Sequence, residues 1–288
     1  MKSFLVCHRG ALGDFILTWP ALCCLRKALP YYQFIGIGRT EYMRLAISFG
    51  LLDTYIDKES ASLLDFFCGK SIPEKIGSPH GAVLWLTEGQ KTVDILKESA
   101  SLPVVSITPF PDEQTHLAQY YCSVVQSHFP ITVPQELSDC FPAKLTEGQY
   151  ALIHPGSGSP GKNYSPQFYH ILKEELRRHG YPGTGFIFGP VEDERMNAED
   201  FAGEWIERPK DVEALAGLLS GASLYIGNDS GVSHLSGFIG TLTIALYKTT
   251  DPEKWGVLGK KVVHISAANE ISAKRKVQKC LNSLERKS

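Results

Sequence analysis

The chain has 288 residues, of which 43% are hydrophobic and 21% are charged, and its formal net charge at pH 7 is −2. This composition is typical of a soluble protein long enough for two domains, and it excludes a strong global field that would favour nucleic acid as a partner. The apolar stretch at the start is too short for a secretory signal, and no apolar run approaches the roughly 20 residues that span a bilayer. Seven scattered cysteines lack metal-binding spacing, so we expect a cytoplasmic protein with reduced thiols.

Strands and helices alternate along the first part of the chain. Short apolar runs predict strands at residues 4–8, 33–37, 54–56, 82–86 and 104–107. Helical spacing of apolar residues, with breakers at the ends, predicts helices at residues 15–29, 40–49, 60–67, 92–99 and 115–128. Pro20 is expected in the first turn of a helix or at a kink. Residues 129–142 carry three prolines and few periodic positions, which predicts a linker.

The same alternation resumes after the linker. Strands are predicted at residues 151–154, 186–188, 224–226, 242–247 and 262–265. Helices are predicted at residues 165–180, at residues 211–220, from residue 231, and around Val277, Leu281 and Leu284. The fold class is therefore α/β, with two doubly wound Rossmann-like domains at residues 1–142 and 143–288. Such sheets bind ligands beyond the carboxyl ends of their strands, so we expect the site in a cleft between the domains.

The stretch at residues 224–234 (LYIGNDSGVSH) combines a buried strand, a tight polar turn and the start of a helix. This geometry binds phosphate, because free backbone N–H groups at the helix start point at the ligand. Ser230 and Ser233 would add hydroxyl donors, and His234 lies in the first helical turn. The alternative interpretation is that Asp229 or Ser230 only caps the helix.

The turn at residues 154–164 (HPGSGSPGKNY) is a second candidate for phosphate binding. Backbone N–H groups with Ser157 or Ser159 would surround a diphosphate, and the compact cation of Lys162 would neutralise it. A flexible surface loop with an exposed lysine is the alternative. The stretch does not have the glycine spacing of a Walker motif.

The third candidate is the turn at residues 10–14 (GALGD), at the end of the first strand. Its glycines allow the backbone to approach a ligand closely. Asp14 either caps the following helix or faces the cleft, where it would accept a proton from a hydroxyl. No acidic cluster in the sequence predicts a metal site.

These three turns together resemble the signatures of the heptosyltransferases of lipopolysaccharide assembly, glycosyltransferase family nine. Residues 9–22 resemble the N-terminal signature, and residues 154–164 the central one, in which Trp is more usual at Tyr164. Residues 227–234 and 250–255 resemble the signature of the donor site. Lys248 and Thr249 stand where the family usually has Gly-Pro.

The resemblance implies a GT-B fold and transfer of heptose from ADP-heptose with inversion, without a required metal or other cofactor. It implies that Asp14 is the general base and that Gly10, Ala11 and Gly13 lie on the acceptor side. The residues implied to bind the nucleotide diphosphate are Ser157, Gly158, Ser159, Lys162, Asp229, Ser230, Gly231 and His234. Lys162 is also implied to assist departure of the diphosphate.

The implied acceptor is a glycan or lipid-linked hydroxyl, as in the lipopolysaccharide core, with peripheral association at the inner membrane if the acceptor is lipid-linked. Three alternatives stay open. They are a transferase with another nucleotide sugar or a protein acceptor, a sugar-nucleotide epimerase on the same two-domain plan, and a binding module without turnover.

Overall fold

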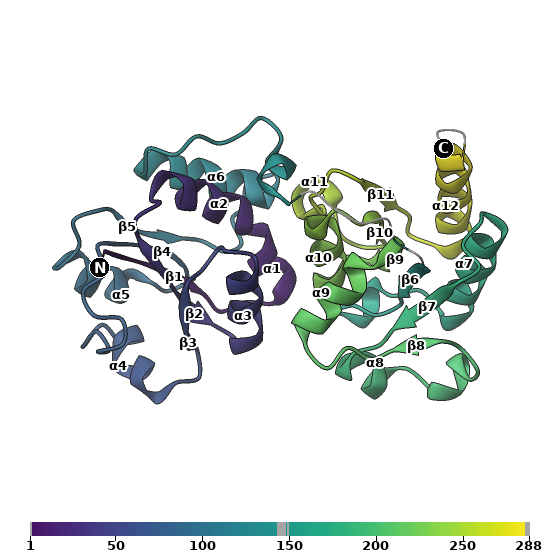
Figure 1. Cartoon of the computed structure of the whole chain (residues 1–288), viewed down its shortest axis with the longest axis horizontal. Coiled ribbons are helices and arrows are strands. Elements are labelled where there is room, and N and C mark those ends of the chain that lie inside the picture. Colours follow the sequence, from purple (N-terminus) through teal and green to yellow (C-terminus); the bar gives the residue numbers. More distant parts are fainter. Residues whose placement is uncertain (1, 143–147, 149, 286–288) are drawn as a thin grey trace. The chain divides into compact units, whose positions relative to one another are not determined.

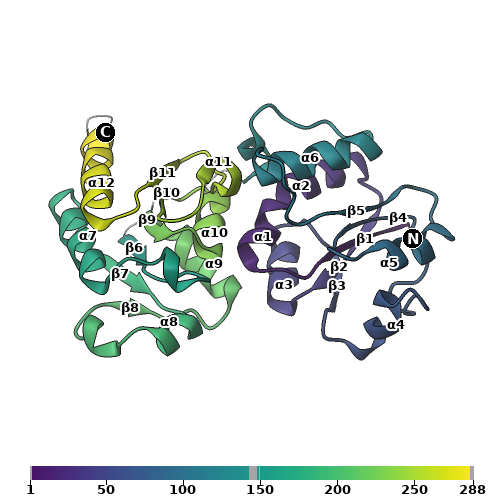
Figure 2. The same cartoon turned by 180° about the vertical axis from the view of Figure 1, so that it is seen from behind.

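The computed structural model describes residues 2–142, 148 and 150–285. The chain forms two compact units, Met1–Cys140 and Phe141–Ser288 (Figures 1 and 2). The predicted boundary after residue 142 lies two residues beyond this division, and residue 143 is outside the described part. Phe141 already belongs to the second unit because its ring packs on Phe238, with centroids 4.7 Å apart.

The first unit contains a five-stranded sheet in the order β3-β2-β1-β4-β5, with every neighbouring pair parallel. Its strands are β1 Ser3–His8, β2 Gln33–Gly38, β3 Thr54–Asp57, β4 Gly81–Trp85 and β5 Val104–Ile107. Its helices are α1 Leu12–Leu17, α2 Trp19–Ala28, α3 Thr40–Ser48, η1 Ala61–Leu63, α4 Leu64–Phe67, α5 Gln90–Lys97, α6 Leu117–His128 and η2 Leu137–Cys140. All five predicted strands are confirmed.

The predicted helix at residues 15–29 is two helices, and this is a correction. The chain turns at Thr18, whose hydroxyl donates to the carbonyl of Phe15 at 2.7 Å. Pro20 then occupies the first turn of α2, where its missing N–H costs nothing. One continuous helix would place the proline ring against the carbonyl of Ile16, so the break has a steric cause.

The segment predicted as a linker is mostly packed on the first unit. Phe129, Ile131 and Leu137 are all buried, and the Cys140 carbonyl accepts a hydrogen bond from the Cys23 thiol on α2 at 3.4 Å. The prolines interrupt helical periodicity, but the apolar residues between them still gain free energy by leaving water. The sequence therefore correctly predicted that the prolines prevent a regular helix, but it did not predict that the apolar residues between them are buried.

The second unit contains a six-stranded parallel sheet in the order β11-β10-β9-β6-β7-β8. Its strands are β6 Tyr150–His154, β7 Thr184–Ile187, β8 Ile206–Glu207, β9 Ala222–Asn228, β10 Leu242–Tyr247 and β11 Val262–Ser266. Its helices are η3 Pro160–Lys162, α7 Pro166–Arg178, α8 Pro190–Arg195, η4 Ala198–Phe201, α9 Val212–Ser220, α10 Gly231–Ile239, α11 Pro252–Trp255 and α12 Glu270–Glu285. The edge strand β8 and the short helix α8 have too few residues for a periodic signal and were not predicted.

Helices cover both faces of each sheet, as a doubly wound fold requires (Figure 1). In the second unit, Ile153 and Ile226 project into one core with Leu172 of α7 and Val277 of α12. Strand order reverses direction between β1 and β4 in the first sheet and between β6 and β9 in the second. These two switch points are where such sheets bind ligands. Within the described part of the chain, no helix combines the length and apolarity needed to cross a membrane.

We expect Leu172→Ala to destabilise the second unit by about 2–5 kcal/mol, because Leu172 is fully buried on α7 and its loss leaves a cavity. Urea denaturation followed by circular dichroism measures this change. The neighbouring Ile171 is 40% exposed on the same helix, so Ile171→Ala is the matched control. Equal destabilisation by the two variants would contradict the packing of α7 described above.

Candidate active site

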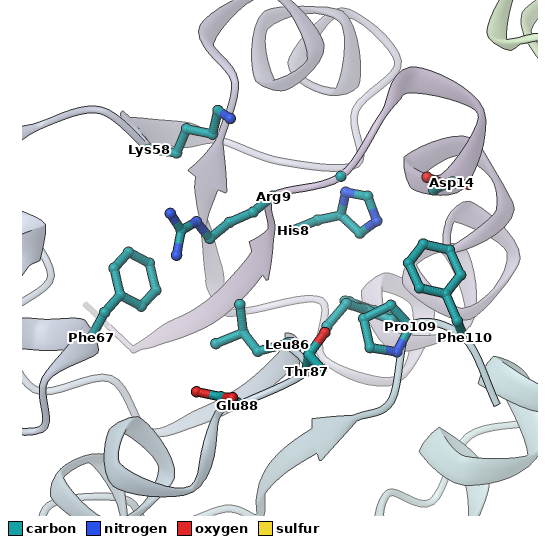
Figure 3. A pocket seen from close by; sticks show the side chains of 12 residues that line it. His8, Arg9, Asp14, Lys58, Phe67, Leu86, Thr87, Glu88, Pro109 and Phe110 are labelled. Carbon is teal, nitrogen blue, oxygen red and sulfur yellow. The ribbon is translucent and has the colours of Figure 1, made fainter. Parts of the chain in front are cut away.

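The switch point of the first sheet opens into a pocket of about 560 Å³ (Figure 3). His8 ends β1, and Trp85 is its register partner at the end of β4. Asp14 lies in the first turn of α1 and lines this pocket together with Gly10.

Charged side chains surround the rest of this pocket. The charged residues besides Asp14 are Arg9, Lys58 and Glu88. Arg9 lies over the ring of Phe67 at 4.6 Å, on the opposite side of the pocket from Asp14 (Figure 3). The described residues that line the pocket do not include Ala11 or Gly13, although both lie in the turn that carries Asp14. Asp14 therefore lies on one side of the pocket, and Arg9, Lys58 and Glu88 lie on the other (Figure 3).

The switch point of the second sheet is organised by Asn228, the last residue of β9. Its side chain is fully buried, and its amide nitrogen donates to the Pro155 carbonyl at 2.8 Å. The same nitrogen lies 2.8 Å from the hydroxyl of Tyr169 on α7. Because a buried amide without partners is costly, these bonds fix the turn after β6 against the end of β9. The structure thus brings together the two turns predicted to bind phosphate.

Asp229, the next residue, forms a salt bridge with Lys162. Its carboxylate is 7% exposed and lies 2.7 Å from the ammonium of Lys162, whose side chain is 29% exposed. The Thr250 hydroxyl donates to the same oxygen at 2.7 Å, and His234 Nε2 lies 3.7 Å from the other. Burial alone would raise the pKa of Asp229, but His234 and Lys162 outweigh burial and hold that pKa well below its usual range. The site therefore presents an anchored ammonium to solvent above an ionised carboxylate.

The start of α10 completes this arrangement. Ser230 caps the helix, since its hydroxyl accepts from the backbone N–H of Ser233 at 3.4 Å. The capping alternative is therefore correct for Ser230, although the hydroxyl also lies 3.4 Å from His154 Nδ1. Gly231 is the first residue of the nine-residue helix. His234 is buried one turn later and faces Asp229.

The turn after β6 contains both fixed and open positions. The buried Ser157 hydroxyl lies 2.7 Å from the Ser159 carbonyl and 2.6 Å from Asn163 Oδ1. Gly158 faces open space, with no atom within 4 Å of the position that a Cβ would take. Internal hydrogen bonds therefore fix the turn. This disagrees with the alternative interpretation of residues 154–164 as a flexible surface loop.

Within the described residues, no group of three or more His, Cys, Asp or Glu side chains is placed to hold a metal ion.

Comparison with known proteins identifies the family. Residues 112–284, more than half of the chain, match the sequence pattern of Glycosyltransferase family 9 (heptosyltransferase). The chain belongs to glycosyltransferase family 9. The resemblance inferred from the three signatures is confirmed.

Solved structures of this family share the fold. The chain superposes on a family 9 glycosyl transferase from Veillonella parvula with a TM-score of 0.77 at 20% identity, covering 100% of this chain and 98% of that one. E. coli heptosyltransferase WaaC with ADP gives a TM-score of 0.73 at 18% identity, with coverage of 98% and 99%. E. coli ADP-heptose lps heptosyltransferase II gives 0.73 at 15% identity, with 100% of both chains covered. The GT-B architecture of this family 9 chain is thereby confirmed.

Sequence reasoning missed a buried contact between a histidine and a glutamate behind the β6 turn. His154 Nε2 lies 3.5 Å from Glu192 Oε1, and Glu192 Oε2 accepts from the Gly189 N–H at 2.8 Å. Burial alone would raise the pKa of Glu192, but the bond with His154 lowers it below the ordinary value. A Cβ on Gly156 would come 1.7 Å from Glu192 Oε1, so only glycine allows this approach. Glu192 follows a Gly-Pro turn after β7, and that position at a strand end was the available signal.

Lys248, which stands with Thr249 where the family usually has Gly-Pro, contacts the turn after β6. Its ammonium donates to the Asn163 carbonyl at 2.6 Å and lies 5.4 Å from the centre of the Tyr164 ring. Lys248 thus braces the turn next to Lys162. A cavity of about 380 Å³ opens beside this turn, lined by Asn163, Tyr164 and Glu192 among others.

We expect Asp229→Asn to destabilise the second unit by roughly 1–3 kcal/mol at pH 7, because Lys162 and His234 lose an ionised partner. Since the folded-state pKa of Asp229 is depressed, its contribution is complete above the ordinary pKa of about 3.9 and is lost as the pH falls below it. Urea denaturation at pH 7 and at pH 3 should show the difference between variant and wild type shrinking. Asp193→Asn removes a carboxylate whose side chain is 45% exposed and is the control, with little change expected. A difference for Asp229→Asn that is as large at pH 3 as at pH 7 would contradict the depressed pKa.

Proposed function

We propose that this family 9 chain is an inverting, metal-independent glycosyltransferase that moves heptose from ADP-heptose to a hydroxyl of a lipopolysaccharide-core or related glycan. The observation that carries the proposal is the pairing of Lys162 with the buried Asp229 at the second switch point. It supplies a fixed, solvent-accessible cation beside the start of a helix, which is the combination that a diphosphate needs.

The proposed binding of the donor diphosphate rests on the charges around Asp229. A diphosphate is repelled by the Asp229 carboxylate, so Asp229 acts on it through Lys162 and His234, which it orients. The N–H groups at the start of α10, with Gly158 and the exposed Ser159 across the turn, add donors for the phosphate oxygens. The buried Ser157 hydroxyl instead fixes this turn through its own hydrogen bonds. The neighbouring cavity of about 380 Å³ has room for part of the nucleoside.

The acceptor side follows from proton transfer. The acceptor hydroxyl attacks the anomeric carbon, its proton passes to the Asp14 carboxylate, and a new glycosidic bond forms. The bond from the anomeric carbon to the phosphate oxygen breaks, and ADP leaves with the electron pair. Lys162 and the start of α10 stabilise the charge that develops on ADP. Attack from the face opposite to the leaving group inverts the anomeric configuration.

The choice of ADP-heptose is supported by the family's description and by ADP in the WaaC structure. Family membership also favours glycosyl transfer over epimerisation and over binding without turnover. A cytoplasmic location, with peripheral contact at the inner membrane, follows from a lipid-linked acceptor and is part of this proposal.

We expect calorimetric titration to detect ADP binding and to detect UDP and GDP binding at least tenfold more weakly. Lys162→Ala should weaken ADP binding by about 1.5–3 kcal/mol, the scale of a charged hydrogen bond. Lys210→Ala, which removes an exposed lysine, is the control. Tighter binding of UDP or GDP would contradict ADP-heptose as the donor but would leave the proposal of glycosyl transfer in place. An unchanged Kd in Lys162→Ala would remove Lys162 from the diphosphate site.

We expect Asp14→Ala to lower kcat about 100-fold or more, the scale of general base catalysis, and to leave the Kd for ADP within a few-fold of wild type. Turnover of ADP-heptose with deacylated lipopolysaccharide from a heptose-deficient strain is the assay. Asp65→Ala removes a carboxylate whose side chain is 61% exposed in the same unit and should behave like wild type. If ADP binding fell as much as turnover in Asp14→Ala, the base would lie elsewhere.

A further inference from the structure

His8 is a buried polar residue that borders the pocket containing Asp14. The residue is 3% exposed, and its ring lies 5.1 Å from that of Phe15 and 6.5 Å from that of Trp85. Within the described part of the chain, its Nδ1 is buried and has no hydrogen-bond partner. Because most buried polar atoms in folded proteins are paired, this exception needs an explanation.

The surroundings of His8 decide its protonation state. Burial lowers the pKa of His8 to about 3, so the ring is neutral at pH 7. A neutral imidazole carries one N–H and one lone pair. An unpaired buried N–H is rarer than an unpaired buried acceptor, so the lone pair belongs on Nδ1 and the proton on Nε2.

Gly10, which has no side chain, lies against both the His8 ring and the Asp14 carboxylate. A Cβ on Gly10 would lie 3.0 Å from His8 Cε1, 3.5 Å from His8 Nε2 and 3.4 Å from Asp14 Oδ2. Nε2 and Oδ2 therefore lie within about 7 Å of each other. Figure 3 shows the His8 ring and Asp14 on the same side of the pocket, away from Arg9 and Lys58. Two oxygens of one sugar ring, each in a hydrogen bond of about 2.8 Å, span such a gap.

We propose that His8 is a positioning residue for the acceptor, whose Nε2–H donates to the sugar oxygen adjacent to the hydroxyl that Asp14 deprotonates. The proposal rests on the proposed function, because it takes Asp14 as the base. It assigns the acceptor to the class of sugars that present two neighbouring oxygens to the pocket. A neutral donor suits this place, since a cation so close to Asp14 would stabilise the carboxylate and weaken it as a base.

The test compares two variants of His8. His8→Phe keeps a ring against Phe15 and Trp85 but removes the donor, whereas His8→Gln places an N–H near the position of Nε2. With ADP-heptose and deacylated lipopolysaccharide from a heptose-deficient strain, we expect His8→Phe to lower kcat/KM for the acceptor roughly tenfold, mainly through KM. His8→Gln should stay within about threefold of wild type, and the Kd for ADP should be unchanged in both. The exposed His128 provides the control, His128→Phe.

Two results of this comparison would overturn the proposal. One is a His8→Phe variant with the wild-type acceptor KM. The other is a His8→Gln variant as impaired as His8→Phe. That result would show that restoring an N–H near Nε2 does not restore acceptor binding.

A second measurement needs no acceptor. In protein with ¹⁵N-labelled histidine rings, the signals missing from His8→Gln belong to His8. We expect these signals to report a neutral ring with the proton on Nε2 from about pH 5 to pH 9. A proton on Nδ1, or a charged ring at pH 7, would overturn the proposal whether or not transfer is observed. Absence of transfer by the wild-type protein, with the expected ring signals present, would instead count against the proposed function.

Discussion

The polar site at the switch point of the second sheet depends on a buried negative charge. Placing a carboxylate at the end of a parallel sheet is unfavourable unless cations and hydroxyls compensate it. Asp229 has all of these partners, in Lys162, His234 and Thr250, and each comes from a different part of the second unit. The carboxylate thereby joins η3, α10 and the loop after β10 at one point. The cation that it holds stays accessible to solvent, which makes the arrangement suited to an anionic ligand.

Asn228 fixes the position of Asp229. Its amide bonds to the turn after β6 and to Tyr169 leave the following residue, Asp229, in one defined position. Lys248 and the pair of His154 with Glu192 support the same turn from two other directions. Rigid support of this kind holds the side chains of a site in place before a ligand binds.

The two switch points differ in how completely their polar groups are satisfied. In the second unit, the polar side chains at the strand ends form a connected set of hydrogen bonds. In the first unit, the described residues around Asp14 include a buried imidazole nitrogen without a partner, next to a pocket of about 560 Å³. A saturated network suits a site for one constant group, such as a diphosphate.

The sequence by itself determined the alternation of strands and helices, the two doubly wound units and the turns that carry the candidate residues. These features are local, because apolar periodicity and Gly or Pro at the ends are set by neighbouring residues. Only the tertiary structure decided which side chains meet. The ion pair of Lys162 with Asp229 spans 67 positions and the bond from Lys248 spans 85. His154 at the end of β6 meets Glu192 on α8. The packing of residues 129–142 and the unpartnered Nδ1 of His8 also depend on elements far along the chain. Such contacts follow from strand order and register, which periodicity does not encode.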